Sequence, residues 1–72
     1  MTYNNGGTPA VGDHVNAYTD GKHYVQWGVE HAKVTVVTPI GQGGSITVGW
    51  DGGNSDTCTA TNNILVNVYK VA

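Results

Sequence analysis

Three aromatic residues have the side chains best suited to binding chemistry in this sequence. Tyr18 and Tyr24 flank the turn signal Asp20-Gly21, and Trp50 follows the run 46-ITVG-49. Aromatic rings exposed on a sheet can hold a peptide, a cation or a base. The alternative is structural, with the tyrosines as a cross-strand pair and Trp50 as part of a small core. We take Tyr18, Tyr24 and Trp50 as candidate ligand-binding residues and leave that alternative open.

The run 51-DGGNSD-56, directly after Trp50, is rich in glycine and short oxygen-bearing side chains. Such side chains can bind a hard cation, but the spacing lacks the closing glutamate of an EF-hand loop. The run also lacks the lysine and the following helix of a phosphate-binding loop. Aspartate, glycine and asparagine are what a hairpin turn requires, so we predict a turn here. Asp51 and Asn54 remain candidate ligand-binding residues beside Trp50, and no metal or cofactor is predicted.

The histidines and the single cysteine do not form a recognisable catalytic or zinc-binding pattern. Zinc needs three or four converging ligands, and we expect His14, His23 and His31 to point apart. Cys58 has no base near it in sequence, and free cysteine is usually buried, so we expect a small core residue. No nucleophile-elbow pattern appears. We therefore predict a protein that is not an enzyme.

The composition narrows the range of partners. Charged residues make up 11% of the 72 residues, the net charge is −2, and the three lysines are scattered without any arginine. Phosphate binding needs clustered cations, so neither nucleic acid nor an anionic membrane is an expected partner. Low charge gives little repulsion between copies, which makes a homo-oligomer plausible. The start, MTYNNGGTPA, lacks a signal-peptide pattern and no stretch resembles a membrane span, so we expect a cytoplasmic protein.

The residue pattern predicts an all-β chain with one domain. Residues 1–9 are polar and glycine-rich and are predicted to be a flexible leader, and residues 10–72 form the domain. Valine and threonine favour strands, whereas glycine and asparagine favour turns. The predicted strands cover residues 13–18, 23–38, 45–51, 55–60 and 64–69. The second strand is long, and Gly28 is predicted to bend it.

Alternation of side chains predicts which residues face the core. A three-residue loop, 19–21, would place Ala17 opposite His23 and Val15 opposite Val25, which keeps the apolar side chains on one face. A two-residue loop, 20–21, would mix polar with apolar side chains. The predicted inward residues of the later strands are Ile46, Val48, Cys58, Ala60, Ile64, Val66 and Val68. Asn62-Asn63 is predicted to be a short turn.

The runs 11-VGDHVNAYTDGKHY-24 and 46-ITVGWDGGNSDT-57 resemble the SH3-like barrels of the Tudor type over about residues 10–66. The resemblance implies a closed five-stranded barrel with a long bent second strand, a shape that leaves no exposed sheet edge. It also implies an aromatic cage, in which Tyr24 matches one wall, Tyr18 stands at a second and Asn54 matches the polar member. Gly49 and Gly52 stand where the family has cage aromatics.

The Gly-Asp-x-Val pattern at residues 12–15 also resembles the plasmid-type dihydrofolate reductases, which are small barrels assembled around a pore. Their Val-Gln-Ile-Tyr run has no counterpart in 57-TCTATNNIL-65. The function expected is therefore a small interaction module that binds a protein or peptide through aromatics near the barrel loops. Alternatives are a homo-oligomeric assembly protein, of the kind that phages use as accessories, and a pore-forming oligomeric enzyme.

Overall fold

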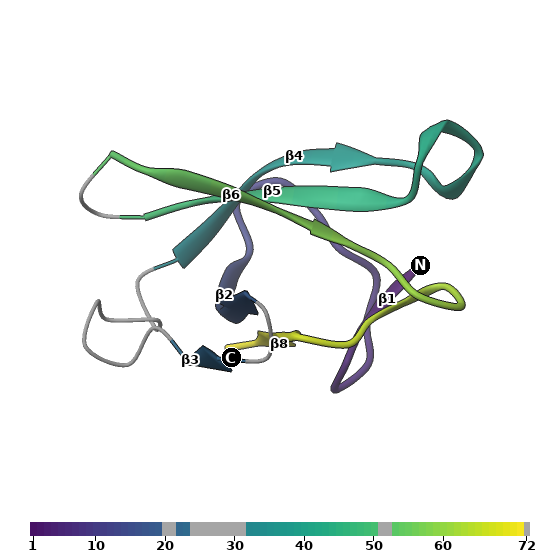
Figure 1. Cartoon of the computed structure of the whole chain (residues 1–72), viewed down its shortest axis with the longest axis horizontal. Helices are drawn as coiled ribbons and strands as arrows, with labels where there is room; N and C mark the ends of the chain where they lie inside the picture. Colours follow the sequence, from purple (N-terminus) through teal and green to yellow (C-terminus); the bar gives the residue numbers. More distant parts are fainter. Residues whose placement is uncertain (20–21, 24–31, 51–52, 72) are drawn as a thin grey trace.

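The protein is an all-β chain, as predicted, and Figure 1 shows it as a computed structural model. Residues 1–19, 22–23, 32–50 and 53–71 are described, with residues 18, 19, 22 and 23 described for the backbone. The strands are β1 (Thr2–Tyr3), β2 (His14–Thr19), β3 (Lys22–His23), β4 (Ala32–Thr38), β5 (Ser45–Gly49), β6 (Ser55–Thr59), β7 (Ile64–Leu65) and β8 (Val68–Lys70). One 3₁₀ turn, η3 (Ile40–Gln42), lies between β4 and β5. Within these ranges no helix has the length and apolar character that crossing a membrane requires.

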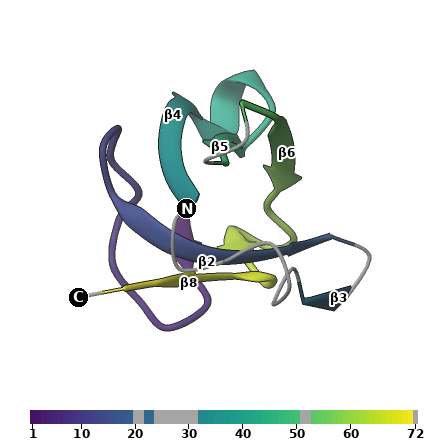
Figure 2. The same cartoon turned by 90° about the vertical axis from the view of Figure 1, so that its left-hand side faces the viewer.

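The strands form one antiparallel sheet and one small parallel pair. The sheet has the order β3-β2-β4-β5-β6, and β8 also pairs with β2. The pair consists of β1 and β7. Seen end on, β4, β5 and β6 form a layer that curls over β2 and β8 (Figure 2). The core therefore lies between these two groups of strands.

The core consists of alanine and larger aliphatic side chains together with one tyrosine. Its buried residues are Tyr3, Val15, Ala17, Ala32, Val34, Ile46, Val48, Leu65 and Val68. Val15 and Ala17 on β2, and Ile46 and Val48 on β5, face inward as predicted. Cys58 and Ala60 are half-buried and pack against this core, which confirms their predicted side of the sheet, and Trp50 is half-buried and packs there as well.

The predicted register of the first hairpin is wrong. β2 pairs with β3 as Tyr18↔His23 and Thr19↔Lys22, so only positions 20 and 21 separate the paired ends. This is the spacing that an Asp-Gly dipeptide favours in a two-residue hairpin loop. The alternation of side chains predicts Val15 opposite Val25, but the partners of Val15 are Ala32 and Lys70. The turn signal therefore outweighed the side-chain pattern of residues 24–29, which lie outside the described part of the chain.

The region predicted as one long second strand contains two described strands, β3 and β4. From Tyr18↔His23 an unbroken ladder would place Val15 opposite position 26, whereas its observed partner in this region is Ala32. The predicted bend at Gly28 lies outside the described residues. A register shift between Val34 and Val36 is a β-bulge within β4, with Thr35 as the extra residue. The bulge exposes Val36 to 49% and turns Val37 toward the core.

The predicted last strand, residues 64–69, is divided into β7 and β8. Ile64 and Val66, predicted to face the core, are exposed, whereas Leu65 and Val68 are buried. The turn at residues 66–67 shifts the alternation by one position, which the regular pattern Ile-x-Val-x-Val conceals.

The predicted turn at Asn62-Asn63 is confirmed. Both asparagines have positive φ angles, 52° and 66°, and Thr61 and Ile64 exchange backbone hydrogen bonds across them. Asparagine tolerates this left-handed conformation better than most residues, which is why it suits a two-residue hairpin loop.

The predicted flexible leader is instead part of the packed structure. β1 pairs with β7, and Tyr3 is only 1% exposed. Beyond β1, the Asn4 backbone N–H donates to the Val68 carbonyl at 2.8 Å, and the Asn4 side chain donates to the Val66 carbonyl at 2.8 Å. The Asn5 amide donates to the Lys70 carbonyl at 3.0 Å and accepts from the Lys70 N–H at 2.9 Å. The polar composition that indicated disorder supplies these hydrogen bonds.

A carboxylate fixes the buried Tyr3 side chain at its polar end. The Tyr3 hydroxyl donates to Asp13 Oδ2 at 2.6 Å, and the Ala10 N–H donates to the same oxygen at 3.0 Å. Lys70 Nζ lies 3.9 Å from Asp13 Oδ1. The hydrogen bond from Tyr3, followed by that from Ala10, lowers the pKa of Asp13 below its ordinary value. Burial, with the same carboxylate as a neighbour, raises the pKa of Tyr3.

Replacing Tyr3 by alanine should destabilise the protein by about 3–5 kcal/mol, because a large buried ring leaves a cavity. Tyr3→Phe keeps the ring and should cost much less. Equilibrium urea unfolding, followed by circular dichroism, measures both free energies of unfolding. If Tyr3→Ala unfolds like the wild type, the N-terminal segment does not belong to the cooperative core.

Acid should destabilise the protein through Asp13. The pKa of Asp13 in the folded protein lies below its unfolded value of about 3.8, so its contribution to stability is present above that value. The contribution is lost as the pH falls through the folded pKa. Urea unfolding at neutral pH and in acid should show this loss in the wild type and a smaller pH dependence in Asp13→Asn. Equal pH dependence in both proteins would contradict the role assigned to Asp13.

Candidate functional site

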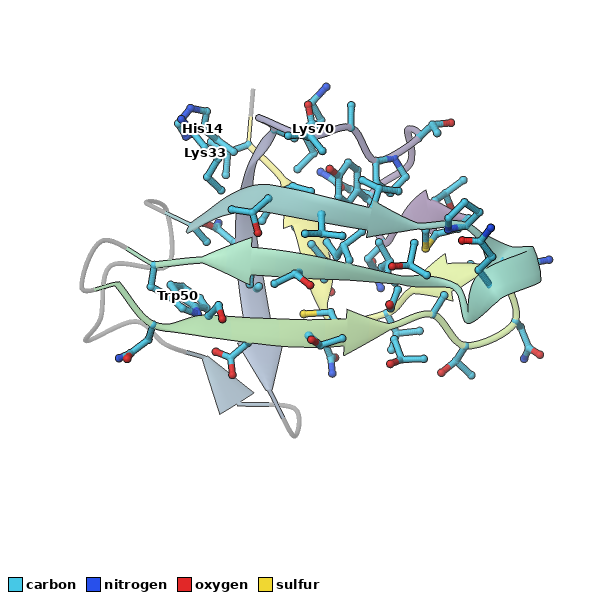
Figure 3. The ribbon with its side chains drawn as sticks, turned by 90° about the horizontal axis from the view of Figure 1, so that it is seen from above. His14, Lys33, Trp50 and Lys70 are labelled. Atoms are coloured by element: carbon cyan, nitrogen blue, oxygen red, sulfur yellow. The ribbon has the colours of Figure 1, made fainter. Side chains whose placement is uncertain are left out.

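Trp50 and Asn54 are the two predicted binding residues that the structure describes in full. Both belong to the turn that joins β5 to β6, and Figure 3 shows Trp50 at this end of the sheet. The Trp50 N–H donates to the Asn54 carbonyl at 2.9 Å, and the Gly53 N–H donates to the Trp50 carbonyl at 2.9 Å. The predicted hairpin turn is therefore present, and it brings Trp50 and Asn54 together through their backbones.

The Trp50 side chain is held by a hydrogen bond, and the residue packs against the core. The indole Nε1–H donates to Asp56 Oδ2 at 2.8 Å. Trp50 is half-buried, so part of the residue remains in contact with solvent. The structure therefore supports the reading of Trp50 as part of the small core, and its role in ligand binding stays a prediction.

The other predicted binding residues are placed only in part. Tyr18 pairs with His23 through its backbone on β2, at a position where no side chain is described. Tyr24 and Asp51 lie outside the described residues. The described part of the chain therefore does not assemble an aromatic cage, and the cage that the Tudor resemblance implies stays a prediction.

Cys58 has the environment of an unreactive thiol. It is half-buried on the inner face of β6, and burial, with Asp56 as a secondary cause, raises its pKa to about 11. The thiol is therefore protonated at neutral pH, and a protonated thiol is a poor nucleophile. No group of three or more histidine, cysteine, aspartate or glutamate side chains gathers as metal ligands in the described ranges.

The strand register brings together basic residues that are far apart in the sequence. His14 on β2 lies directly opposite Lys33 on β4, and Lys70 on β8 lies opposite the next residue, Val15. Figure 3 shows the three basic side chains on the same side of the molecule. Asp13 lies beside Lys70 and offsets part of this positive charge. Sequence spacing alone made these lysines look scattered, because only strand pairing makes them neighbours.

The outer edge of β6 is the most distinctive surface that the structure describes. The Ala60 N–H donates to the Gly44 carbonyl, and the Trp50 N–H donates to the Asn54 carbonyl, so 44↔60 and 50↔54 are hydrogen-bonded pairs of the β5–β6 register. Hydrogen-bonded pairs alternate with non-bonded pairs in an antiparallel ladder. It follows that 46↔58 and 48↔56 are bonded, whereas 45↔59, 47↔57 and 49↔55 are not.

This alternation determines where the backbone groups of β6 point. The N–H and C=O groups of Ser55, Thr57 and Thr59 face away from β5, toward the outer edge. These residues have exposed side chains, and no backbone hydrogen bond joins this edge to another described strand. The strand carries none of the lysines, prolines or bulges that commonly protect an edge.

The sequence contains a local signal for the solvated face of β6. The run Ser55–Thr59 alternates exposed hydroxyl side chains with the half-buried Asp56 and Cys58, as expected for a strand with one solvated face. What the run could not reveal is its place at the end of the strand order, because that depends on which strands find partners elsewhere.

Comparison with known proteins adds no assignment: no protein-family model matches the chain, no curated protein matches its sequence, and no solved structure matches its fold.

Replacing Asp56 by alanine should destabilise the protein by about 1–3 kcal/mol, since the half-buried indole N–H loses its acceptor. Asp56→Asn keeps a carbonyl acceptor at the same place and should lose less. Thermal and urea unfolding, read from tryptophan fluorescence, give both values. Equal losses for the two variants would mean that the carboxylate charge matters more than the hydrogen bond.

Proposed function

We propose that this chain is a small, non-catalytic interaction module that binds a protein or peptide strand along the outer edge of β6. The observation that carries the proposal is the row of backbone donors and acceptors of Ser55, Thr57 and Thr59 facing outward. An extended chain can add to such an edge as a further strand, with main-chain hydrogen bonds supplying affinity.

We also propose that the fold is an SH3-like barrel similar to that of Tudor domains. Two features of the strand arrangement support this. A two-residue connection joins β2 to β3, and β4, β5 and β6 follow one another as a meander. The last strand, β8, returns to pair with β2, and the β4–β6 layer curls over both (Figure 2). A small barrel requires such a return of the chain to its first long strand.

Trp50 gives this edge a means of selecting side chains. Its indole lies at the start of β6, is held by Asp56, and is half-buried at the end of the sheet. An aromatic or aliphatic side chain of a bound strand could pack on the remaining indole surface, as aromatic residues often do at interfaces. Asn54 stands exposed beside it as a polar neighbour.

Selection from a display library of random peptides tests the proposal. We expect peptides to be enriched on the wild type, to change tryptophan fluorescence on binding, and to slow hydrogen exchange of the Thr57 amide. Thr57→Pro removes the outward N–H without removing a bond to β5, so it should fold and lose binding at least tenfold. Thr57→Ala is the matched control, which keeps the N–H and should retain binding.

Two results would contradict the proposal. One is the absence of any peptide enriched on the wild type over Thr57→Pro, together with the absence of any other protein strand, a second copy included, on the β6 edge. The other is enriched peptides that bind Thr57→Pro as well as they bind Thr57→Ala, since such peptides do not use the β6 backbone.

A further inference from the structure

We propose that the partner of the β6 edge is a second copy of this chain, whose β6 strand adds antiparallel about a two-fold axis at Thr57. This inference rests on the proposed function, because it names the occupant of the edge proposed there. It predicts a symmetric dimer in which two sheets continue into one another through β6 and its copy.

Geometry limits the possible registers of such a pair. Residues directly opposite each other in an antiparallel pair lie on the same face of the sheet. The exposed residues Ser55, Thr57 and Thr59 must therefore meet their counterparts, and not Asp56 or Cys58. The two-fold axis then passes through one of residues 55 to 59. An axis at 55 or 59 would pair only a single exposed residue of β6 with its own copy, so the registers to compare are those centred on residues 56, 57 and 58.

Hydrogen bonding favours the register centred on Thr57. In that register Thr57 meets its own copy, and Ser55 and Thr59 meet each other twice, so every outward N–H and C=O of β6 finds a partner. A two-fold axis at residue 56 or 58 leaves the residue at one end of each strand without an opposite residue in the other β6. The self-complementary pattern of β6 is what a closed two-fold interface requires.

The charges on β6 point to the same register. An axis at residue 56 would place the two Asp56 carboxylates directly opposite each other, which is unfavourable. With the axis at Thr57, each Asp56 lies opposite Cys58 of the other copy, whose raised pKa leaves it neutral at physiological pH. The whole chain carries a net charge of only −2, so repulsion between two copies is weak.

The outer edge of β8, in the same chain, is an example of a protected edge. The outer edge of β8 is covered by Asn4 and Asn5, which bond to the Val68 carbonyl and to both backbone groups of Lys70. No comparable cover lies along β6 among the described residues. A strand edge with matched, uncharged and exposed residues on both partners is suited to pairing with itself.

Charge-paired variants test the dimer and its register together. Sedimentation equilibrium of the wild type should show a mass that rises toward twice the monomer mass with concentration. In Thr57→Lys and in Thr57→Glu, like charges meet at the axis, so each variant alone should dissociate at least tenfold more readily. An equimolar mixture should associate again, because lysine then meets glutamate.

Val36→Lys is the matched control. It adds the same charge to the same outer face, at an exposed position on β4, away from the β6 edge. It should leave the wild-type association unchanged if the edge is the interface. If Val36→Lys abolishes association as Thr57→Lys does, the copies meet face to face and the edge pairing is wrong.

The outcomes also separate this inference from the proposed function. A wild type that stays monomeric at every concentration, or a mixture no more associated than its components, overturns the two-fold pairing. If library peptides still bind wild type and fail on Thr57→Pro, the edge is a binding surface for another protein. If both experiments fail, the proposed function is wrong as well.

Discussion

The packing and hydrogen bonding of the N-terminal segment against the last strands is the constraint on which the rest of this small structure depends. The chain has 72 residues and one cysteine, so no disulfide within the chain can stabilise its thin core. Tyr3 supplies the only large aromatic ring among the fully buried side chains that are described, and Asp13 fixes its hydroxyl. Asn4 and Asn5 then bond to the Val66 carbonyl and cover the outer edge of β8 with side-chain and backbone hydrogen bonds. Residues that would otherwise fray thus close one side of the fold.

The outer edges of β8 and β6 differ in how their backbone groups are satisfied, and this difference bears on binding. An amide side chain such as that of Asn5 has an NH₂ group that donates and an oxygen that accepts. It can therefore take the place of a strand residue opposite Lys70. Along β6 the same kinds of backbone groups point outward, and no described residue covers them in this way. Unpaired strand edges are where proteins add strands from partners or from further copies of themselves. The proposed binding role through main-chain groups, with Trp50 as a neighbouring side-chain contact, is based on this difference between the two edges.

Local irregularities decide which side chains reach the core. The extra residue at Thr35 reverses the alternation within β4, so that Val36 is exposed while Val37 turns inward. A turn at residues 66–67 shifts the side-chain alternation between β7 and β8. As a result Ile64 and Val66 are exposed, whereas Leu65 and Val68 are buried. Because strand alternation has a period of two, a single added residue moves every later side chain to the opposite face. Neither irregularity is marked by a glycine or a proline in the sequence.

The sequence by itself determined the all-β class, most strand positions, the Asn62-Asn63 turn and the inward face of β2 and β5. These depend on local preferences, since β-branched residues, turn residues and alternation act within a few positions of each other. Only the tertiary structure decided the partners of Val15 and the packing of residues 1–5, because each depends on residues distant in the chain. The register of the first hairpin follows instead from the local Asp-Gly turn signal, to which the prediction gave too little weight. The tertiary structure also decided the β6 edge and the grouping of His14, Lys33 and Lys70. Which strand lies at the edge of a sheet, and which basic residues lie near one another, depends on how all the other strands pair.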